Sequence, residues 1–475
     1  MAPPLRQRQR TSTKAQPRST GCLASDERGS EGDQGATNPD LKQIVPRAGR
    51  SALSPPSGAE YYISCDDVES MEFLVSSQTV TDGAIARHLG LDWLRIGAFA
   101  LLIPYHIGMY FVPGHWVVKS AHPVEWVGWL LDAMQPWRLP LLFLVSGYAS
   151  RALLAKLGGP AGFLRSRSKR LLIPLAFGTI VVAAPQGWVR AAEMGYSGSF
   201  PDFWLHHWLA FADFRGVSFP TTEHLWFLTY LWTYSLLVCA GPFLLPSAWT
   251  VRLSRLTADL GTGYRALIWP MLLIVFLRLA LLFVLPDSGT LLTNWHGHIA
   301  YVPPFLFGFA LAGAPGLWPA IARCRRPALA ISVACYAIIL WRELSYPVGA
   351  VPPHLAEAVA RSASGAMGWS ASLALLAFAH LRLRRDHRLR RSLGEAVFPF
   401  YIVHQTIIVT VGWEIRPLGY SAPAEFAIIA AATAFGCWSF YEAGRRVRWL
   451  RPLVGLSPKR AEPQPAATLA PSSAA

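Results

Sequence analysis

Charged residues are scarce in this chain: they make up 15% of its 475 residues, whereas hydrophobic residues make up 52%. Soluble domains contain about 25% charged residues. The apolar residues also gather into runs of roughly 17–22 residues, the length of helix that crosses a hydrocarbon core of about 30 Å. The scarcity of charge therefore argues against a soluble globular fold and predicts an all-α, polytopic integral membrane protein.

Motifs for several common chemistries are also missing. The sequence has no Gly-rich phosphate loop, no GxSxG nucleophile elbow and no CxxC pair. His206-His207 and His296-Gly297-His298 match no recognised metal-ligand spacing, so neither a metal site nor a permanently bound cofactor is expected. The six cysteines are scattered, and three fall in apolar runs, where they should be buried as small hydrophobic residues: Cys239, Cys335 and Cys437.

Basic residues give the chain a formal net charge of +15, which can indicate nucleic-acid binding. They lie mostly at the ends of the apolar runs, however, and strongly favour alternate connecting segments, so no nucleic-acid partner is expected. By the positive-inside rule, the basic segments and both termini should lie in the cytoplasm, which requires an even number of spans. Ten spans are expected, near residues 92–112, 137–155, 170–189, 224–245, 266–286, 299–316, 327–342, 363–381, 393–413 and 424–444.

The two ends of the chain have a different composition. Residues 1–88 are rich in Ser, Pro, Gly, Arg and Asp, and they are expected to be a disordered tail because they cannot bury enough apolar surface. No signal peptide is evident there, so the first membrane helix is expected to direct insertion. Residues 458–475 should form a second disordered tail in the cytoplasm, which leaves residues 89–457 for the ten-helix domain.

Arg95 and His106 lie eleven residues apart in the first span, close to three whole helical turns, so they share one face. The rise between them is about 16.5 Å. With Arg95 near the headgroups, His106 is expected near the bilayer midplane, and Pro104 should open the helix locally. A titratable ring at that depth is costly unless it faces a cavity or a partner. Two interpretations stay open: a general base in an embedded site, or a hydrogen bond to a neighbouring helix.

Two further residues fall at a similar depth, Arg278 in the fifth span and His404 in the ninth. A guanidinium keeps its charge, so Arg278 should face a partner, water or an anion, which favours a functional role over a structural one. For His404, a functional role and an interhelical hydrogen bond are equally compatible with its position.

Charged residues at the span ends are candidates for binding. Arg167 and Arg170 share a face at the cytoplasmic mouth and, with Arg95, could grip phosphates, although the positive-inside rule explains them more simply. Arg138 and His224 open the second and fourth spans at the outer face. They could contact a substrate outside the cytoplasm, or simply anchor the helices at the interface.

Several segments, in the same order along the chain, resemble the membrane acyltransferase 3 family. They are the Arg95-x10-His106 pattern, the Arg167-x-x-Arg170 pair and residues 138–147 of the second span. Further segments look like its glucan biosynthesis protein C branch, the glucan succinyltransferases: residues 224–228, 301–305 and 400–405, and Tyr441-Glu442 near the end. The similarity covers about residues 88–457.

This resemblance implies a ten-helix O-acyltransferase of the bacterial inner membrane. It would move an acyl group, succinyl in the glucan branch, from cytoplasmic acyl-CoA to hydroxyls of a periplasmic glucan or related glycan. The resemblance implies catalytic roles for His106 and Arg95 and coenzyme A binding by Arg95, Arg167 and Arg170. The substrate side is expected to include Arg138, Trp116, His224, Arg278 and His404.

Two rival functions stay open. One is an O-acetyltransferase that acts on lipopolysaccharide or another surface glycan. The other is a transporter or flippase, because Arg and His inside a membrane also suit proton or anion pathways. Against a transporter, the sequence shows no paired halves with matching broken helices.

Overall fold

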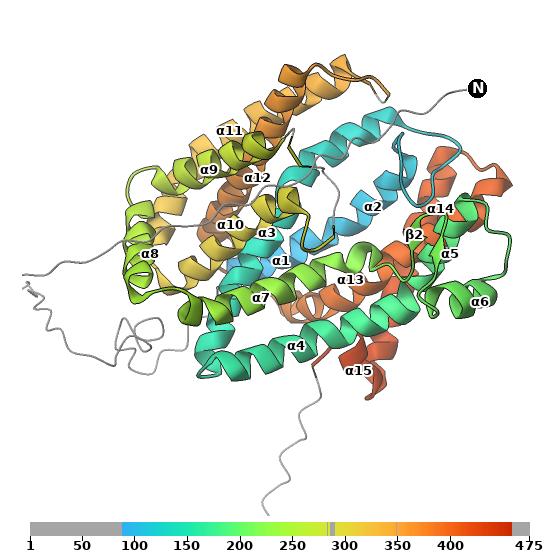
Figure 1. Ribbon diagram of the computed structural model, residues 1–475, viewed down its shortest axis with the longest axis horizontal. Coiled ribbons are helices and arrows are strands. Elements are labelled where there is room, and N and C mark those ends of the chain that lie inside the picture. The colour runs from blue at the N-terminus through green and yellow to red at the C-terminus, as the bar shows by residue number, and fades with distance from the viewer. Residues whose placement is uncertain (1–87, 283, 286–289, 348, 458–475) are drawn as a thin grey trace, which may run out of the picture. The chain divides into compact units, whose positions relative to one another are not determined.

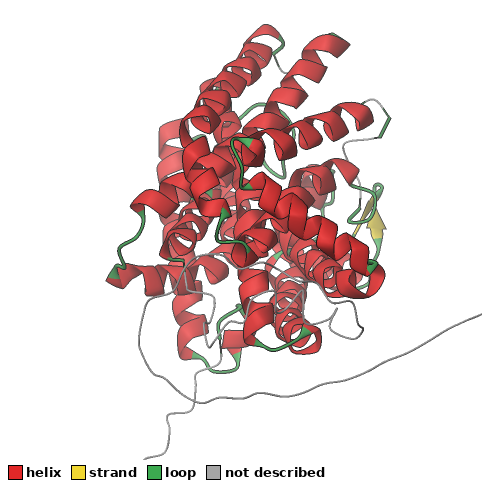
Figure 2. Cartoon of the chain, turned by 90° about the vertical axis from the view of Figure 1, so that its left-hand side faces the viewer, coloured by secondary structure: helices red, strands yellow, loops and turns green. Residues whose placement is uncertain are grey.

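Helices make up almost all of the regular structure in the computed structural model, which describes residues 88–282, 284, 285, 290–347 and 349–457. Figure 2 shows one small two-stranded element beside them. The prediction of an all-α fold is therefore confirmed for this part of the chain. The two predicted tails, residues 1–88 apart from His88 and residues 458–475, lie outside the described residues.

The first span is a helix broken at a single residue. Helix α1 (Leu89–Ala100) and helix α2 (Leu102–Phe111) meet at Leu101. Pro104 lies in the first turn of α2, where it has no N–H to give to the carbonyl of Ala100, and its ring crowds that carbonyl. The expected local opening is thus confirmed: the helix breaks at Leu101, three residues before Pro104 and five before His106.

The next elements lead to a connecting region of short pieces. A loop of residues 112–124 precedes α3, and α4 continues through a π-helical turn into α5 with a bend of 43°. The two strands pair antiparallel, with Asp213 opposite Ser218. In order these elements are α3 (Glu125–Lys156), α4 (Pro160–Phe177), η2 (Gly178–Val182), α5 (Ala184–Glu193), α6 (Phe200–Phe203), η3 (Trp204–Trp208), β1 (Asp213–Phe214), β2 (Val217–Ser218), η4 (Glu223–Leu225) and α7 (Trp226–Leu244).

The C-terminal half consists of longer helices. Between α8 and α9 the chain turns by 114°, and α9, α11 and α12 pack together with α3. The elements are α8 (Ser247–Leu260), α9 (Arg265–Leu281), α10 (Trp295–Gly313), α11 (Leu317–Ser345), α12 (His354–Arg382), α13 (Arg388–Ile415), η5 (Arg416–Leu418), α14 (Ala422–Arg446) and α15 (Leu450–Leu453).

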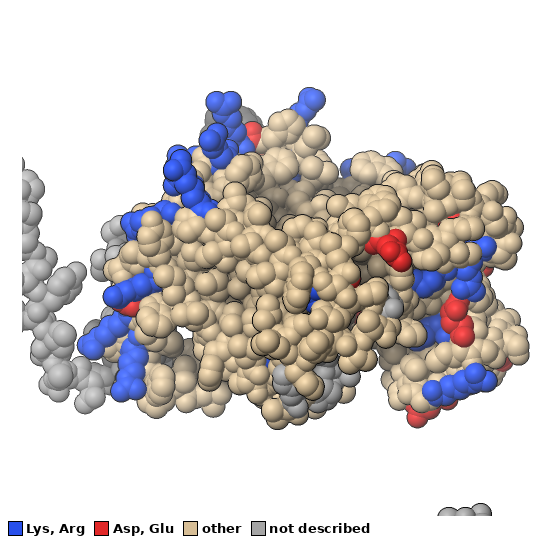
Figure 3. Space-filling model, turned by 90° about the horizontal axis from the view of Figure 1, so that it is seen from above, with Lys and Arg blue, Asp and Glu red and all other residues tan. Residues whose placement is uncertain are grey.

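Each of the ten predicted spans overlaps a helix. By length and composition, seven of the described helices can cross a membrane, and up to nine can if each bent pair is one span. Helix α10 belongs to neither group, so the predicted count of ten stays a prediction. Large apolar side chains point outward, such as Phe276 on α9 and Phe435 on α14, and between charged edges the surface in Figure 3 is largely uncharged. This surface is suited to lipid.

Among the helices that begin earlier than predicted, α3 and α11 each contain a proline that a sequence pattern treats as a boundary. Helix α3 begins twelve residues before the expected position 137, and α11 begins ten residues before position 327. Pro136 and Pro327 lie inside these helices. Neighbouring helices stabilise the chain on both sides of such a proline, which an isolated peptide cannot do.

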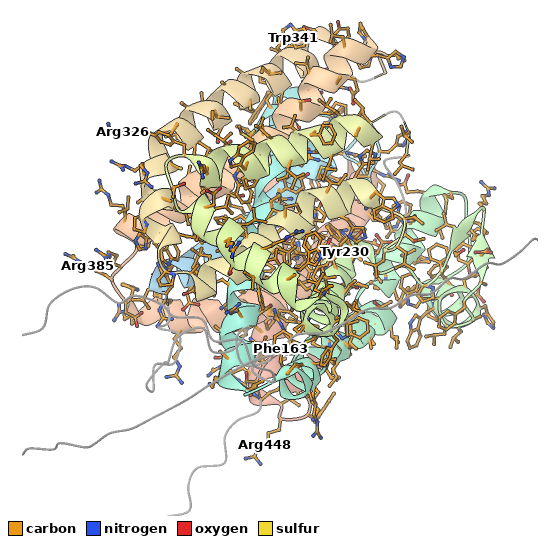
Figure 4. The ribbon with its side chains drawn as sticks, turned by 60° about the vertical axis from the view of Figure 1, so that its left-hand side comes forward. Phe163, Tyr230, Arg326, Trp341, Arg385 and Arg448 are labelled. Atoms are coloured by element: carbon orange, nitrogen blue, oxygen red, sulfur yellow. The ribbon has the colours of Figure 1, made fainter. Side chains whose placement is uncertain are left out.

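The side chains at the helix ends agree with the basic pattern seen in the sequence. Arg385 and Arg448 project outward just after α12 and α14 end, and Arg326 projects outward from α11, whereas Tyr230 points among the packed helices (Figure 4). Inside, Cys239, Cys335 and Cys437 are buried free cysteines, as predicted.

Glycines allow α3 and α10 to touch through their backbones. A Cβ on Gly147 would collide with the carbonyl oxygen of Phe305, and a Cβ on Gly308 would collide with that of Leu144. Small residues are the usual means by which membrane helices approach this closely. The contact fixes the position of α3, which carries Arg138.

We predict that Gly308→Ala destabilises the folded protein by about 1–3 kcal/mol, because the added methyl group must push the two backbones apart. Gly241→Ala on α7 is the matched control, since a Cβ there meets nothing within 4 Å. Thermal unfolding in detergent should show a lower Tm for Gly308→Ala alone. Equal Tm values for the two variants would contradict the close packing.

Candidate active site

A cavity of about 420 Å³ lies where α2, α3, α13 and the start of α7 meet, and we call it the histidine cavity. Helices α1 and α2 pack against α13 in the interior (Figure 1). The residues that line the cavity come from distant parts of the chain. They include four predicted site residues, His106, Trp116, Arg138 and His224. Tyr401 and Gln405 of α13 also line the cavity.

A hydrogen bond joins the two histidines that the sequence placed at similar depth. His404 Nε2 lies 3.1 Å from His106 Nδ1. The other nitrogen of His404, Nδ1, lies 3.1 Å from the carbonyl oxygen of Phe400 and 2.9 Å from that of Tyr401. Carbonyl oxygens only accept, so Nδ1 carries the proton of His404 and its Nε2 is an acceptor when the ring is neutral.

The same reasoning assigns the proton of His106. Its Nδ1 lies between His404 Nε2 and the carbonyl oxygen of Leu102, at 2.9 Å, and both of these accept. Nδ1 is therefore the donor, and the lone pair of a neutral ring lies on Nε2. His106 Nε2 forms no hydrogen bond with any described residue. His404 is thus an interhelical hydrogen-bond partner of His106, and a role for His106 as a base stays a prediction.

Aromatic rings enclose His106. Trp116 lies 6.3 Å from it between ring centroids and nearly parallel, at 19°, and Tyr105 meets it edge-on at 5.4 Å. Trp116 belongs to the loop of residues 112–124, which is fastened at two points. Lys119 Nζ donates to the carbonyls of Met109 and Val112, both at 2.7 Å, and Ser120 Oγ donates to Glu425 of α14 at 2.5 Å.

Lys119 is held in a half-buried position beside the C-terminal end of α2. Burial lowers the pKa of Lys119 to about 8, because the charged ammonium loses contact with water. Its two carbonyl partners include the last ones of α2, so the side chain closes that helix end. The loop therefore holds Trp116 over His106 as part of the folded structure.

Arg138 lies at a different position along its helix from the one predicted, whereas His106 lies where the predicted span of residues 92–112 puts it. His106 is five residues, about 8 Å, from the C-terminal end of α2. Arg138 lies thirteen residues, about 20 Å, from the start of α3, so the expectation that it opens its helix was wrong. The error follows from the early start of α3, which places Arg138 inside the protein.

Arg138 is only 3% exposed. Its Cζ lies 3.5 Å from the centroid of the Tyr105 ring, and its Nε and Nη1 form no hydrogen bond with any described residue. Arg190, the other arginine that lines the cavity, is in contrast bound to Glu223 through two hydrogen bonds of 3.2 and 2.8 Å.

His224 lines the cavity, but both of its nitrogens are used within the protein. Nε2 donates to the carbonyls of Tyr401 at 3.1 Å and Ile402 at 2.9 Å, and Nδ1 lies 3.4 Å from Gln186 Nε2. Gln186 also donates to Thr406 at 2.6 Å. These bonds attach α5 and η4, the turn that leads into α7, to α13. Contact between His224 and a substrate stays a prediction.

A second cavity of about 570 Å³, which we call the basic cavity, lies at the other end of α1. Six arginines and two carboxylates line it, an excess of four positive charges. Asp92 pairs with Arg390 at 2.7 Å, and Glu395 pairs with Arg451 at 3.2 Å. Sequence reasoning explained most of these arginines by membrane orientation alone. The six are Arg95, Arg170, Arg390, Arg391, Arg445 and Arg451.

The predicted pair Arg167 and Arg170 is divided between two environments. Arg170 lines the basic cavity, but Arg167 is not among its lining residues. Arg167 Nη2 instead donates to the carbonyl of Ser146 at 3.3 Å and to the hydroxyl of Ser150, both on α3. Phosphate binding by Arg167 stays a prediction, whereas its contact with α3 is a structural one.

Arg278 is also away from both cavities. It packs against α12, where its Cδ lies 3.0 Å from the place that a Cβ on Gly365 would take. The histidine pairs noted in the sequence have ordinary partners: His298 accepts from Tyr234 at 2.9 Å, and His206 lies 3.0 Å from Asp202. Among the described residues, no group of three His, Cys, Asp or Glu side chains could hold a metal ion.

A layer of aromatic rings separates the two cavities. On α1, Ile96 lines the basic cavity and Phe99 lines the histidine cavity; on α13, Phe398 and Tyr401 divide in the same way. Tyr401 lies 5.5 Å from Phe99 and 6.2 Å from Phe398 between ring centroids. The two cavities are therefore consecutive along α1 and α13.

Together these features define a polytopic membrane protein with a hydrogen-bonded histidine pair at one cavity and an arginine-rich second cavity. The chain belongs to the acyltransferase domain family, whose model matches residues 88–442. This confirms the family resemblance seen in the sequence and favours acyl transfer over transport.

Curated relatives include proteins named glucans biosynthesis protein C. The one from Escherichia coli strain SMS-3-5 / SECEC is 28% identical over 145 residues, which is 30% of this chain and 36% of the relative. Those from Escherichia coli O1:K1 / APEC and O157:H7 (strain EC4115 / EHEC) are 27% identical over the same shares. The chain thus matches about a third of the length of these relatives. No solved structure matches it.

We predict that His404→Phe lowers kcat for acyl transfer about fivefold, because His106 loses the acceptor that orients its ring and one such bond contributes about 1 kcal/mol. His404→Gln keeps a carbonyl acceptor and should retain more activity than His404→Phe. Steady-state kinetics should show these changes in kcat, with KM for the donor unaltered. Equal losses in the two variants would contradict the orienting role.

Proposed function

We propose that this protein transfers a succinyl group from acyl-CoA in the cytoplasm to hydroxyl groups of a periplasmic glucan. The observation that carries the proposal is the arrangement along the first span, α1 followed by α2. An arginine-rich cavity lies beside α1, and His106, with an available lone pair, lies on α2. The names of the relatives support glucan biosynthesis as the setting.

The basic cavity suits the phosphate end of coenzyme A. Guanidinium groups bind phosphate oxygens through paired hydrogen bonds, and the excess of arginines would favour a polyanion. From there the long arm of the donor would extend along α1. The thioester would have to pass the layer of Phe99 and Tyr401 to reach His106, a rise of about 16.5 Å from Arg95.

The histidine cavity suits a sugar hydroxyl. Trp116 and Trp226 offer flat apolar faces to a sugar ring, and the Arg190–Glu223 pair offers polar groups for its hydroxyls. His106 lies near the end of α2 that the positive-inside rule assigns to the periplasm, so an acceptor from that side has a short path.

The reaction needs two proton transfers, one from the acceptor hydroxyl to His106 and one from His106 to the leaving thiolate. His106 Nε2 takes the proton of the acceptor hydroxyl as its oxygen attacks the thioester carbonyl. A C–O bond forms, the C–S bond breaks, and the proton passes from the imidazolium to the departing thiolate. While His106 is charged, its Nδ1–H continues to donate to His404 and Leu102, so the ring keeps its orientation.

This assignment places the protein in the bacterial inner membrane, with both termini in the cytoplasm. The arginines of the basic cavity would lie on the cytoplasmic side together with the outward-pointing Arg326, Arg385 and Arg448. The two sides of the membrane then supply the two substrates.

We predict that His106→Ala abolishes transfer, a loss of about 10²–10⁴-fold, because no base remains to accept the hydroxyl proton. Purified protein in nanodiscs, given succinyl-CoA and glucan, would be assayed for thiol release. The variant should elute and unfold as the unmodified protein does. Retained acylation in a folded His106→Ala variant would overturn the assignment of the base.

We also predict that Arg170→Gln raises KM for the acyl donor several-fold, about tenfold if one charge-assisted bond is lost. Arg167→Gln is the matched control: it should lower thermal stability, because it removes the bonds to Ser146 and Ser150, with a smaller effect on KM. A larger KM change in Arg167→Gln than in Arg170→Gln would reverse these roles.

A further inference from the structure

Arg138 leaves one positive charge in the histidine cavity without a compensating carboxylate. Among the described residues that line this cavity, Glu223 is the only carboxylate, and Arg190 already pairs with it. Thr221 donates a further hydrogen bond to Glu223 at 2.7 Å. Arg138 itself rests on the Tyr105 ring, with Nε and Nη1 lacking hydrogen-bond acceptors among the described residues.

A buried guanidinium in this state is energetically costly. Removal of a charge from water costs several kcal/mol unless an opposite charge or good hydrogen bonds replace the water, as a general order of magnitude. Tyr105 supplies the face of its ring and a hydrogen bond from a neutral side chain, which attract a cation more weakly than a carboxylate does. An anionic group that enters the cavity would therefore bind where the protein has left the charge unbalanced.

We propose that Arg138 is the specificity-determining residue of this enzyme and binds the free carboxylate at the far end of a dicarboxylic acyl group. The inference rests on the proposed function and adds the residue that selects the acyl group. The basic cavity already accounts for the phosphates of the donor, and a neutral sugar acceptor needs no cation. The acyl group is the remaining substrate part that can carry a permanent charge.

The position of Arg138 fits that role. Its guanidinium lies against Tyr105, the residue next to His106 in the chain, and the rings of Tyr105 and His106 are 5.4 Å apart. A short acyl group whose carboxylate contacts Arg138 would thus have its thioester end close to the base. A planar guanidinium held flat against a ring also keeps its edges for the two oxygens of a carboxylate.

A role for Arg138 in stabilising the negative oxygen of the reacting carbonyl is the competing explanation. That charge forms in every acyl transfer, whether or not the acyl group carries a carboxylate. Succinyl-CoA and butyryl-CoA distinguish the two roles. Both acyl groups have four carbons, and they differ in whether the far end is a carboxylate or a methyl group.

The experiment measures kcat/KM for both donors with purified protein in nanodiscs and a glucan acceptor. The unmodified protein should prefer succinyl-CoA. In Arg138→Gln, the ratio of succinyl to butyryl transfer should fall about 10- to 100-fold, the worth of a hydrogen bond to a charged group. Arg138→Lys keeps the charge and should recover part of the ratio. Arg190→Gln, the second guanidinium of the cavity, should leave the ratio as it is.

Each possible result either supports or overturns the selective role of Arg138. An Arg138→Gln variant that loses both activities equally, with the ratio unchanged, would overturn the selective role and favour carbonyl stabilisation. An unmodified protein that uses butyryl-CoA as well as succinyl-CoA would also overturn it, even if Arg138→Gln failed to fold. An unmodified protein that transfers neither group to the glucan would instead refute the proposed function and this assignment with it.

Discussion

The hydrogen bond from His106 to His404 is the interaction on which the rest of the site depends. It joins α2 to α13 and assigns the proton of each ring, because backbone carbonyls occupy His404 Nδ1 and share His106 Nδ1. In a bilayer, a polar group that finds no partner within the protein is costly. Within the described part of the chain, every nitrogen of the two rings has a hydrogen-bond partner except His106 Nε2, which is the atom available for chemistry.

Around this pair, the helices form two cavities with different linings. The basic cavity concentrates arginines from α1, α4, α13, α14 and α15, whereas aromatic, histidine and aliphatic side chains form most of the lining of the histidine cavity. Phe99 and Tyr401 lie between the two, so the cavities are close without merging. Arg138 has no carboxylate partner among the residues that line the histidine cavity, unlike Arg190, and its unbalanced charge gives that cavity a preference among acyl groups under our proposal.

Local sequence patterns predicted much of this arrangement. Apolar runs located a helix at each of the ten expected spans, and the spacing of Arg95 and His106 placed them at different depths of the first span, where they line different cavities. Pro104 indicated the break before His106 because proline affects its own helix directly. Gln186 and Gln405, two polar residues within apolar runs, were a further signal of the site that sequence reasoning missed.

Other features depend on contacts between distant segments and could not be read from local patterns. Packing carries α3 through Pro136, which placed Arg138 inside the protein and not at a helix end. Arg451 and Arg390 reach the basic cavity only because α14 and α13 bring their ends together. Likewise, the sequence spacing predicted that Arg167 and Arg170 act together, but Arg167 donates to the hydroxyl of Ser150 on α3 and does not line the basic cavity.

The central claim is that the donor and the acceptor enter from opposite sides of the membrane and meet along the first span, which α1 and α2 form. Proteoliposomes with oriented protein test it most directly. Succinyl-CoA would be supplied on the side of the basic cavity and glucan enclosed on the opposite side. We predict that the enclosed glucan becomes succinylated, and that donor and acceptor confined together to either side give no product. Efficient transfer with both substrates on the same side would contradict the account.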